Sequence, residues 1–191
     1  MGSDQIRWDK EFAGQEFTLG KKPNSFLKKH IHLLPRGKAL DLAAGEGKNA
    51  AFLAKRGFHV EAVDISKAGL KKARRLAGKN GVKIQTHCVD LNSYRIEPGK
   101  YDLIVDFYFL NRRLIPRIKK GLKIGGRVVF ETYTTAQSRL GAGGPHTLRY
   151  QLKSNELLKL FDGMRILFYR EGIFREDGRL KAVASLIAEK K

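Results

Sequence analysis

The stretch ALDLAAGEGKNAAFLAKRGFHVEAVDIS occupies residues 39–66 and contains the strongest structural pattern of the chain. Its first apolar run holds Asp41, a turn of small residues follows, and a helical pattern then leads to a second apolar run that ends at Asp64. A strand, a turn, a helix and a second strand in this order predict a βαβ unit of a parallel sheet. The turn after the first strand should lie at the carboxyl edge of that sheet, where open α/β proteins bind ligands.

The same alternation continues along the whole chain. Apolar runs predict strands at 38–42, 59–64, 82–88, 101–107 and 127–133, and helical patterns predict helices at 47–56, 67–79, 114–121 and 154–161. Two further strand-like runs, 165–173 and 181–189, are joined by a short polar turn, which is typical of an antiparallel pair. The prediction is an α/β fold, Rossmann-like and doubly wound, with a mostly parallel seven-stranded sheet that ends in a C-terminal antiparallel hairpin.

The helix after Ser66 is predicted to be amphipathic and strongly basic. Ser66 is expected to be its N-cap, and Leu70, Ala73 and Ala77 share one face. Basic residues fill the rest of the helix: Lys67, Lys71, Lys72, Arg74, Arg75 and Lys79.

Composition is typical of a soluble single-domain protein. The chain has 191 residues, 42% of them hydrophobic and 30% charged, and no apolar run approaches the length of a membrane span. The single cysteine, Cys88, excludes an internal disulfide framework, fits a reducing cytoplasm and is expected in the core. Thirty-eight Lys and Arg against nineteen Asp and Glu leave a net charge of +19, which fits an anionic partner or charge spread over solvated faces.

The turn after the first strand formally fits a dinucleotide-binding fingerprint. Gly45 to Ala50 matches G-x-G-x-x-A, and Asp64 lies nineteen residues after Gly45, where such sites have the acid that binds a ribose. NAD is therefore one candidate ligand. Asp41 favours another, because a carboxylate beside the turn would repel a pyrophosphate and attract a cation. Asp90 follows the third strand, so three neighbouring strands each end in an acid, which suits a cation carrying a ribose and an adenine.

The whole chain resembles the class I methyltransferases that use S-adenosylmethionine, and more closely a small bacterial branch that includes tellurite-resistance methyltransferases and lies near the thiopurine type. The resemblance is carried by Trp8-Asp9 and by LDLAAGEGKNAAFLAKRG, VEAVDIS, CVDLN and YDLIVDFYFLNRRLIPRIKKGLKIGGRVVFETY. It implies one methyltransferase domain over 1–191, with an N-terminal helical lid or cap segment at 1–36 and a Rossmann-like core at 37–191.

The resemblance also implies a set of cofactor-binding residues. Asp41 and the backbone of the turn would contact the methionine part, Asp64 the ribose and Asp90 the adenine amino group. The full expected set is Trp8, Asp41, Ala43, Ala44, Gly45, Gly47, Asn49, Asp64, Ile65, Asp90, Leu91 and Phe107. The family usually has Gly where this chain has Ala43, a replacement that is tolerable only if the φ angle of Ala43 is negative.

On the substrate side, Tyr108 follows the fourth strand and His146 lies in a glycine-rich loop. Both are candidates for positioning the methyl acceptor, and His146 also for accepting a proton. Methyl transfer from a sulfonium needs no metal, so none is expected. The favoured function is in-line transfer of a methyl group from S-adenosylmethionine to a small-molecule acceptor, such as a soft chalcogen or thiol-like nucleophile, in the cytoplasm. Two alternatives stay open: methylation of RNA or another nucleic acid, suggested by the net charge, and an NAD-binding or non-catalytic cofactor-binding protein.

Overall fold

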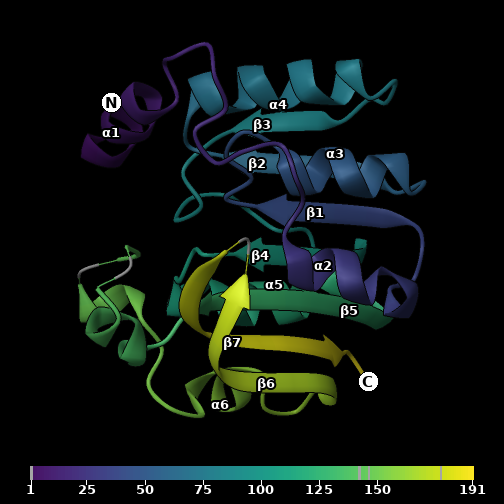
Figure 1. Cartoon of the computed structure of the whole chain (residues 1–191). Coiled ribbons are helices and arrows are strands. Elements are labelled where there is room, and N and C mark those ends of the chain that lie inside the picture. The colour runs from purple at the N-terminus through teal and green to yellow at the C-terminus, as the bar shows by residue number, and fades with distance from the viewer. Residues whose placement is uncertain (1, 142, 146, 177) are drawn as a thin grey trace.

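A computed structural model of the chain describes residues 2–141, 143–145, 147–176 and 178–191. Within these residues seven strands form one sheet with the order β3-β2-β1-β4-β5-β7-β6, which Figure 1 shows crossing the molecule from β3 to β6. The strands are β1 (Lys38–Leu42), β2 (His59–Asp64), β3 (Gln85–Cys88), β4 (Tyr101–Phe107), β5 (Leu122–Tyr133), β6 (Arg165–Glu176) and β7 (Arg179–Glu189). The helices are α1 (Ser3–Glu11), α2 (Ser25–His30), α3 (Lys48–Lys55), α4 (Lys67–Lys79), α5 (Ile115–Gly121) and α6 (Glu156–Leu160), with short 3-10 turns at Ile31–Leu33, Arg112–Leu114, Thr135–Arg139 and Leu148–Tyr150.

The βαβ unit lies where the sequence predicts it. β1 is parallel to β2, with Asp41 opposite Ala62, and parallel to β4, with Asp41 opposite Val105. β1 and β4 are almost entirely buried, as expected for central strands of a parallel sheet that is covered on both faces. Because parallel strands share one direction, the loops after β1, β2 and β4 leave the sheet at the same edge.

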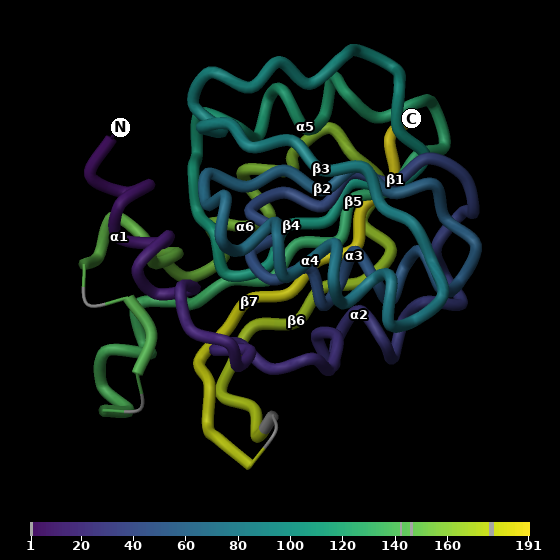
Figure 2. Tube along the Cα trace, turned by 90° about the horizontal axis from the view of Figure 1, so that it is seen from above, coloured from purple at the N-terminus to yellow at the C-terminus, as the bar shows by residue number. Residues whose placement is uncertain are grey.

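Helices cover both faces of the sheet, which makes the fold doubly wound as predicted. Figure 2 shows α2, α3 and α4 on one side of the strands and α5 on the other. On the first side Phe26 and Leu27 of α2 and Leu53 of α3 pack against strand residues such as Leu103. On the second side residues of α5 and α6 pack against a separate apolar cluster. Each apolar helix face therefore has a sheet face to cover.

The predicted antiparallel hairpin is confirmed, and its place in the sheet is a finding of the structure. β7 pairs antiparallel with both β5 and β6, so the last strand of the chain lies inside the sheet and β6 forms its edge. β6 consequently runs in the same direction as β1 to β5. Composition explains why β7 lies inside the sheet and β6 at its edge. The run AVASLIA in β7 is apolar or small throughout and wholly buried, whereas β6 carries charged residues.

Four strand boundaries differ from the sequence prediction. β6 ends at Glu176 instead of Ile173, β7 begins at Arg179 instead of Lys181, and the starts of β3 and β5 also differ. β3 begins at Gln85, three residues later than predicted, because Val82 and Ile84 pack beside Leu76 under α4 before pairing with β2 begins. β5 begins earlier, at Leu122, which pairs with Tyr101 ahead of a bulge. None of the helices in the described part of the chain is long and apolar enough to cross a membrane.

Candidate active site

The turn between β1 and α3 is built from backbone that L-amino acids rarely adopt. Ala43, Gly45 and Gly47 have φ angles of 51°, 52° and 78°. The turn is closed by hydrogen bonds from the N–H of Ala44 to the carbonyl of Val63 at 3.0 Å and from the N–H of Gly47 to the carbonyl of Ala44 at 2.9 Å. A Cβ at Gly47 would lie 2.4 Å from the Cβ of Ala73, so only glycine allows α3 and α4 to approach this closely.

Ala43 corrects one expectation. An alanine was expected to be tolerated at this position only with a negative φ, but the φ angle is 51°. The left-handed region brings the Cβ close to the backbone and costs an alanine roughly 1–2 kcal/mol. The Ala43 side chain is half-buried and packs against the apolar cluster that includes Leu42 and Ile104, which offsets part of that cost. The chain therefore keeps the glycine-type turn with an alanine in it.

Two carboxyl groups near the turn are buried with an unsatisfied oxygen each. Asp41 in β1 is 2% exposed, and no donor among the described residues reaches its Oδ2. Burial, together with the charge of Asp64, raises the pKa of Asp41 to about 7, although the N–H of Ala50 partly offsets the rise. Asp106 in β4 is equally buried, its Oδ1 also lacks a donor, and burial and the charge of Asp41 hold its pKa well above the ordinary value. Asp106 was not among the predicted site residues, although an acid within the apolar run YDLIVDF was a visible signal.

Asp64 connects the end of β2 to the glycine turn. Its Oδ2 accepts the N–H of Gly45 at 2.7 Å and its Oδ1 accepts the N–H of Ser66 at 2.8 Å. Burial raises the pKa of Asp64, and these N–H groups counteract the rise. Ser66 in turn caps α4 as predicted, since its hydroxyl accepts the N–H of Gly69. The carboxylate is thus held beside the turn, with Ile65 half-buried next to it.

The third predicted acid lies in a more open position. Asp90 follows β3, is exposed and accepts the backbone and side-chain N–H groups of Asn92 at 2.8 and 2.9 Å. Leu91 beside it is buried in the apolar cluster on the α5 side.

The prediction that Cys88 lies in the core was wrong, because its side chain is exposed. Its thiol lies 3.5 Å from the carbonyl of Ile65, and desolvation together with nearby acids raises its pKa. A thiol with a raised pKa is a poor nucleophile.

The N-terminal segment packs against the turn. Asp9 accepts the hydroxyl of Ser66 at 2.7 Å and the N–H of Ala68 at 3.0 Å, at the start of α4. Phe12 is buried close to Gly45, where an added Cβ would lie 3.5 Å from its ring. Trp8 is exposed and stacks on Phe12 with 5.4 Å between the ring centroids. Trp8 therefore reaches the turn through Phe12.

Glu46, the central residue of the turn, joins this segment to α4. Its carboxylate accepts the N–H of Thr18 at 3.1 Å and of Leu19 at 2.8 Å, and pairs with Lys72 at 2.7 Å. Lys72 is buried, which corrects the grouping of this residue with the other basic positions of α4. The buried carboxylate is the physical reason, because a buried acid requires a paired cation.

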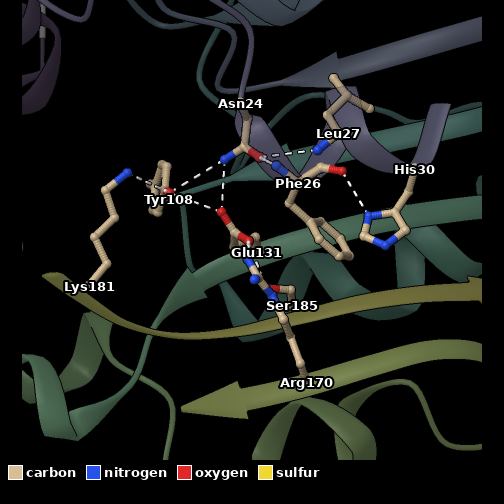
Figure 3. Close-up of polar contacts among 9 residues, drawn as sticks. All are labelled: Asn24, Phe26, Leu27, His30, Tyr108, Glu131, Arg170, Lys181 and Ser185. Atoms are coloured by element: carbon tan, nitrogen blue, oxygen red, sulfur yellow. Dashed lines mark hydrogen bonds and ion pairs between the residues drawn. The ribbon is translucent and has the colours of Figure 1, made fainter. Parts of the chain in front are cut away.

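A polar cluster surrounds the end of β4, as Figure 3 shows. Tyr108 has a φ angle of 63°, and its hydroxyl donates to Glu131 at 2.9 Å and accepts from Lys181 at 3.1 Å. Glu131 of β5 is fully buried and also accepts from Asn24 at 2.8 Å and from Ser185 at 2.6 Å. Tyr108 was predicted from the sequence, whereas Glu131 and Lys181 were not. The signal for these two residues is a charged side chain within a strand that is otherwise largely apolar.

Three further residues were predicted for the site: Asn49, Phe107 and His146. Asn49 is buried in α3, and its Oδ1 accepts the N–H of Asn24 at 2.8 Å, so it is tied to the N-terminal segment. Phe107 is buried with the apolar cluster on the α3 side. His146 lies outside the described residues. No group of three or more His, Cys, Asp or Glu side chains that could hold a metal ion occurs in the described ranges.

Comparison with known proteins assigns the family. A family model described as "Tellurite resistance protein TehB" matches residues 7–181 of the chain. The chain belongs to the TehB family. A TehB of Haemophilus influenzae, named as a probable S-adenosyl-L-methionine-dependent methyltransferase, is 29% identical over 180 residues, covering 83% of this chain and 62% of its own length. The ubiquinone biosynthesis O-methyltransferase of Idiomarina loihiensis is 27% identical over 156 residues, covering 72% and 64%.

The fold comparison agrees with the family. The crystal structure of TehB from Haemophilus influenzae superposes with a TM-score of 0.73 at 21% identity and covers 98% of this chain and 67% of that chain. The seven-stranded sheet with its reversed β7 is thus the class I S-adenosylmethionine-dependent methyltransferase fold. This TehB-family chain spans 62% of the length of the curated TehB that it matches.

Proposed function

We propose that the protein transfers a methyl group from S-adenosylmethionine to a small-molecule acceptor by direct in-line displacement. The observation that carries the proposal is the buried Asp41 carboxyl beside the glycine turn, whose Oδ2 has no donor among the described residues. A buried polar atom without a partner costs roughly 1–3 kcal/mol, so a ligand that satisfies it gains affinity. A cationic ligand does so, whereas the pyrophosphate of NAD would face the acids Asp41 and Asp106.

The residues of this edge fit such a cofactor. Asp41 and the turn 43–47 would hold its methionine part, Asp64 its ribose, and Ile65, Asp90 and Leu91 its adenine. Phe107 would lie by the methyl group, with Trp8 and Asn49 completing the set. α3 begins at Lys48, directly after the turn, so its N-terminus lies at this edge of the sheet. When bound, the cofactor supplies a methyl group on a positively charged sulfur, which is a good leaving group.

The acceptor would lie beside Tyr108. Its left-handed backbone is held by the hydrogen bond from its own N–H to the carbonyl of Glu131 at 2.8 Å and by the contacts of its hydroxyl. Such strain costs of order 1–3 kcal/mol and concentrates at functional sites. The Lys181 ammonium lies 4.9 Å from the ring centroid of Tyr108 and contributes positive charge, which favours the ionised form of a thiol or chalcogen nucleophile. Positioning of this kind supplies up to about 7–11 kcal/mol of a reaction barrier.

The N-terminal segment is proposed to be the cap of this site. Asp9, Phe12 and Glu46 already attach it to the turn and to α4. A cap excludes water from the space above the turn, and a water-poor site strengthens the electrostatic interactions inside it.

The proposal is tested in two steps. Calorimetry with S-adenosylmethionine, S-adenosylhomocysteine and NAD should give binding of the first two and none of NAD; tight NAD binding without a response to the sulfonium would refute the cofactor assignment. Incubation with methyl-labelled cofactor and a cell extract split into metabolites and RNA should then place the label in metabolites, with thiols, selenite and tellurite as defined acceptors. Label recovered in the RNA fraction alone would refute the small-molecule acceptor.

A further inference from the structure

The helix layer formed by α2, α3, α4 and their connecting loops has an unusually one-sided charge. Between residues 17 and 89 the chain has four acids, and all four are buried: Asp41, Glu46, Glu61 and Asp64. Thirteen Lys and Arg of the same stretch are exposed: Lys21, Lys22, Lys28, Lys29, Arg36, Lys55, Arg56, Lys67, Lys71, Arg74, Arg75, Lys79 and Lys83. We call these thirteen residues the basic layer. Every exposed Lys, Arg, Asp or Glu side chain between residues 17 and 89 is therefore positive.

The other side of the sheet is different. There exposed and half-buried bases are interleaved with acids, as in the pairs of Arg112 with Glu156, at 2.6 Å, and of Lys123 with Asp102, at 2.8 Å. No residue of the basic layer takes part in an ion pair within the described ranges. Residues 17–89 hold sixteen Lys and Arg against four Asp and Glu, so this stretch contributes +12 of the net charge of +19.

α4 carries the most regular part of the basic layer. Lys67, Lys71, Arg75 and Lys79 follow one another at intervals of four residues and are all exposed, so they form a single stripe along the helix. Like charges at this spacing destabilise a helix by roughly 0.2–0.5 kcal/mol per pair. The stripe is about 18 Å long at a rise of 1.5 Å per residue, and one nucleic-acid strand presents a phosphate every 3.4 Å or so. A rod-like polyanion would compensate the repulsion along the whole stripe.

Two features of the basic layer select the kind of polyanion. Its aromatic rings are covered by cations: Arg56 lies 5.2 Å from the ring centroid of Phe52, and Arg75 lies 5.2 Å from that of Phe17. Unpaired bases therefore have no exposed ring to stack on, which disfavours a single strand. Within residues 17–89, all of which the structure describes, Leu19 is the single exposed large hydrophobic residue, so the layer offers little to insert into a lipid surface.

We infer that the basic layer docks a double-helical nucleic acid through its phosphates, independently of base sequence. A shallow hollow lined by Lys22, Pro23, Ser25, Lys28 and Lys29 extends the contact from α4 towards α2. The binding surface lies on the outer side of α2, α3 and α4. The bound duplex is therefore a docking partner of the protein and not its methyl acceptor.

The test measures binding of a labelled RNA duplex and a DNA duplex of about 20 base pairs, at salt concentrations from about 50 to 200 mM. The wild-type protein should show a logarithm of affinity that falls linearly with the logarithm of salt, with a slope of about −4 or steeper. The variant Lys29→Gln, Lys55→Gln, Lys71→Gln, Lys79→Gln removes one charge each from α2 and α3 and two from α4. It should lose at least about tenfold in affinity and make the slope shallower by about 3–4 units.

A matched control removes the same charge from the other side of the sheet, where Arg113, Lys120, Lys153 and Lys159 are exposed. Their replacement by Gln should change duplex affinity by less than about threefold. Equal losses in the two variants, absence of salt-dependent binding, or tighter binding of single strands or phosphatidylserine vesicles than of duplexes would overturn the inference. Cofactor calorimetry on both variants should match the wild type, so this inference can fail while the proposed methyltransferase function stands.

Discussion

The carboxylate of Glu46 and the ammonium of Lys72 lie 2.7 Å apart, and both side chains are almost completely buried. Glu46 belongs to the turn after β1, and Lys72 lies in the middle of α4. The same carboxylate accepts the N–H groups of Thr18 and Leu19. One buried ion pair therefore joins the glycine turn, α4 and the N-terminal segment.

Removal of the cation from this pair should be strongly destabilising. Lys72→Met leaves Glu46 as an uncompensated buried charge, and the free energy of unfolding should fall by about 3–5 kcal/mol. Urea denaturation measures the change. The control is Lys71→Met on the exposed side of α4, where a change within about 0.5 kcal/mol is expected. Similar losses in both variants would contradict the importance of the pair.

The left-handed backbone of Ala43 predicts a stabilising substitution. Ala43→Gly removes the Cβ that makes a φ of 51° unfavourable and should raise the free energy of unfolding by about 1 kcal/mol. Ala44→Gly is the matched control, because Ala44 has no positive φ and glycine there only adds freedom to the unfolded chain. Thermal denaturation should show opposite shifts for the two variants; a loss of stability in Ala43→Gly would show that packing of the methyl group dominates.

Asp41 should make the stability of the cofactor-free protein depend on pH. Its pKa is about 7 in the folded state against an ordinary value of 3.8, so between these values the folded protein keeps a proton that the unfolded chain has lost. The contribution of Asp41 to the free energy of unfolding is fully present below about pH 4 and is lost as the pH rises to about 7. Asp41→Asn cannot ionise. Its stability relative to the wild type should therefore increase across this range, by roughly 4 kcal/mol at most. A difference that is constant with pH would refute the raised pKa.

Asp64→Asn separates a binding role from a structural one. The substitution keeps the volume and one acceptor oxygen but removes the charge, so the cofactor should bind about tenfold more weakly or worse while the fold persists. Calorimetry measures affinity and circular dichroism the fold. Asp162→Asn, at an exposed position away from the turn, should leave affinity unchanged. An unfolded Asp64→Asn protein would show that the role of this carboxylate is structural, through its hydrogen bonds with the N–H groups of Gly45 and Ser66.

Tyr108→Phe tests the acceptor side. The substitution removes the hydrogen bonds of the Tyr108 hydroxyl with Glu131 and Lys181. Methyl transfer should slow by about tenfold or more, because the acceptor is then less well positioned. The cofactor Kd should stay the same, since Tyr108 is assigned to the acceptor. Tyr150→Phe, at an exposed tyrosine, serves as the comparison. A Tyr108→Phe protein with normal turnover would remove Tyr108 from the proposed site.

Local signals were sufficient for much of the fold. The bounds of β1, β2 and β4 coincide with those predicted from the apolar runs, and Ser66 caps α4 as expected. These features depend on residues close together in the chain: an apolar run of strand length, a capping hydroxyl and a turn of small residues. The acids Asp41 and Asp64 were found in the same way, because each stands at the end of such a run.

The tertiary structure decided what depends on contacts between distant residues. The burial of Lys72 follows from Glu46, twenty-six positions earlier, and the cluster at Glu131 joins residues from Asn24 to Ser185. The positive φ of Ala43 and the exposure of Cys88 likewise depend on how the turn and the sheet edge are packed. A periodic pattern identifies which face of an element is apolar, but not which other element covers it. The sequence alone therefore determined the elements and the family, and the folded chain determined which charges are buried, paired or left on the surface.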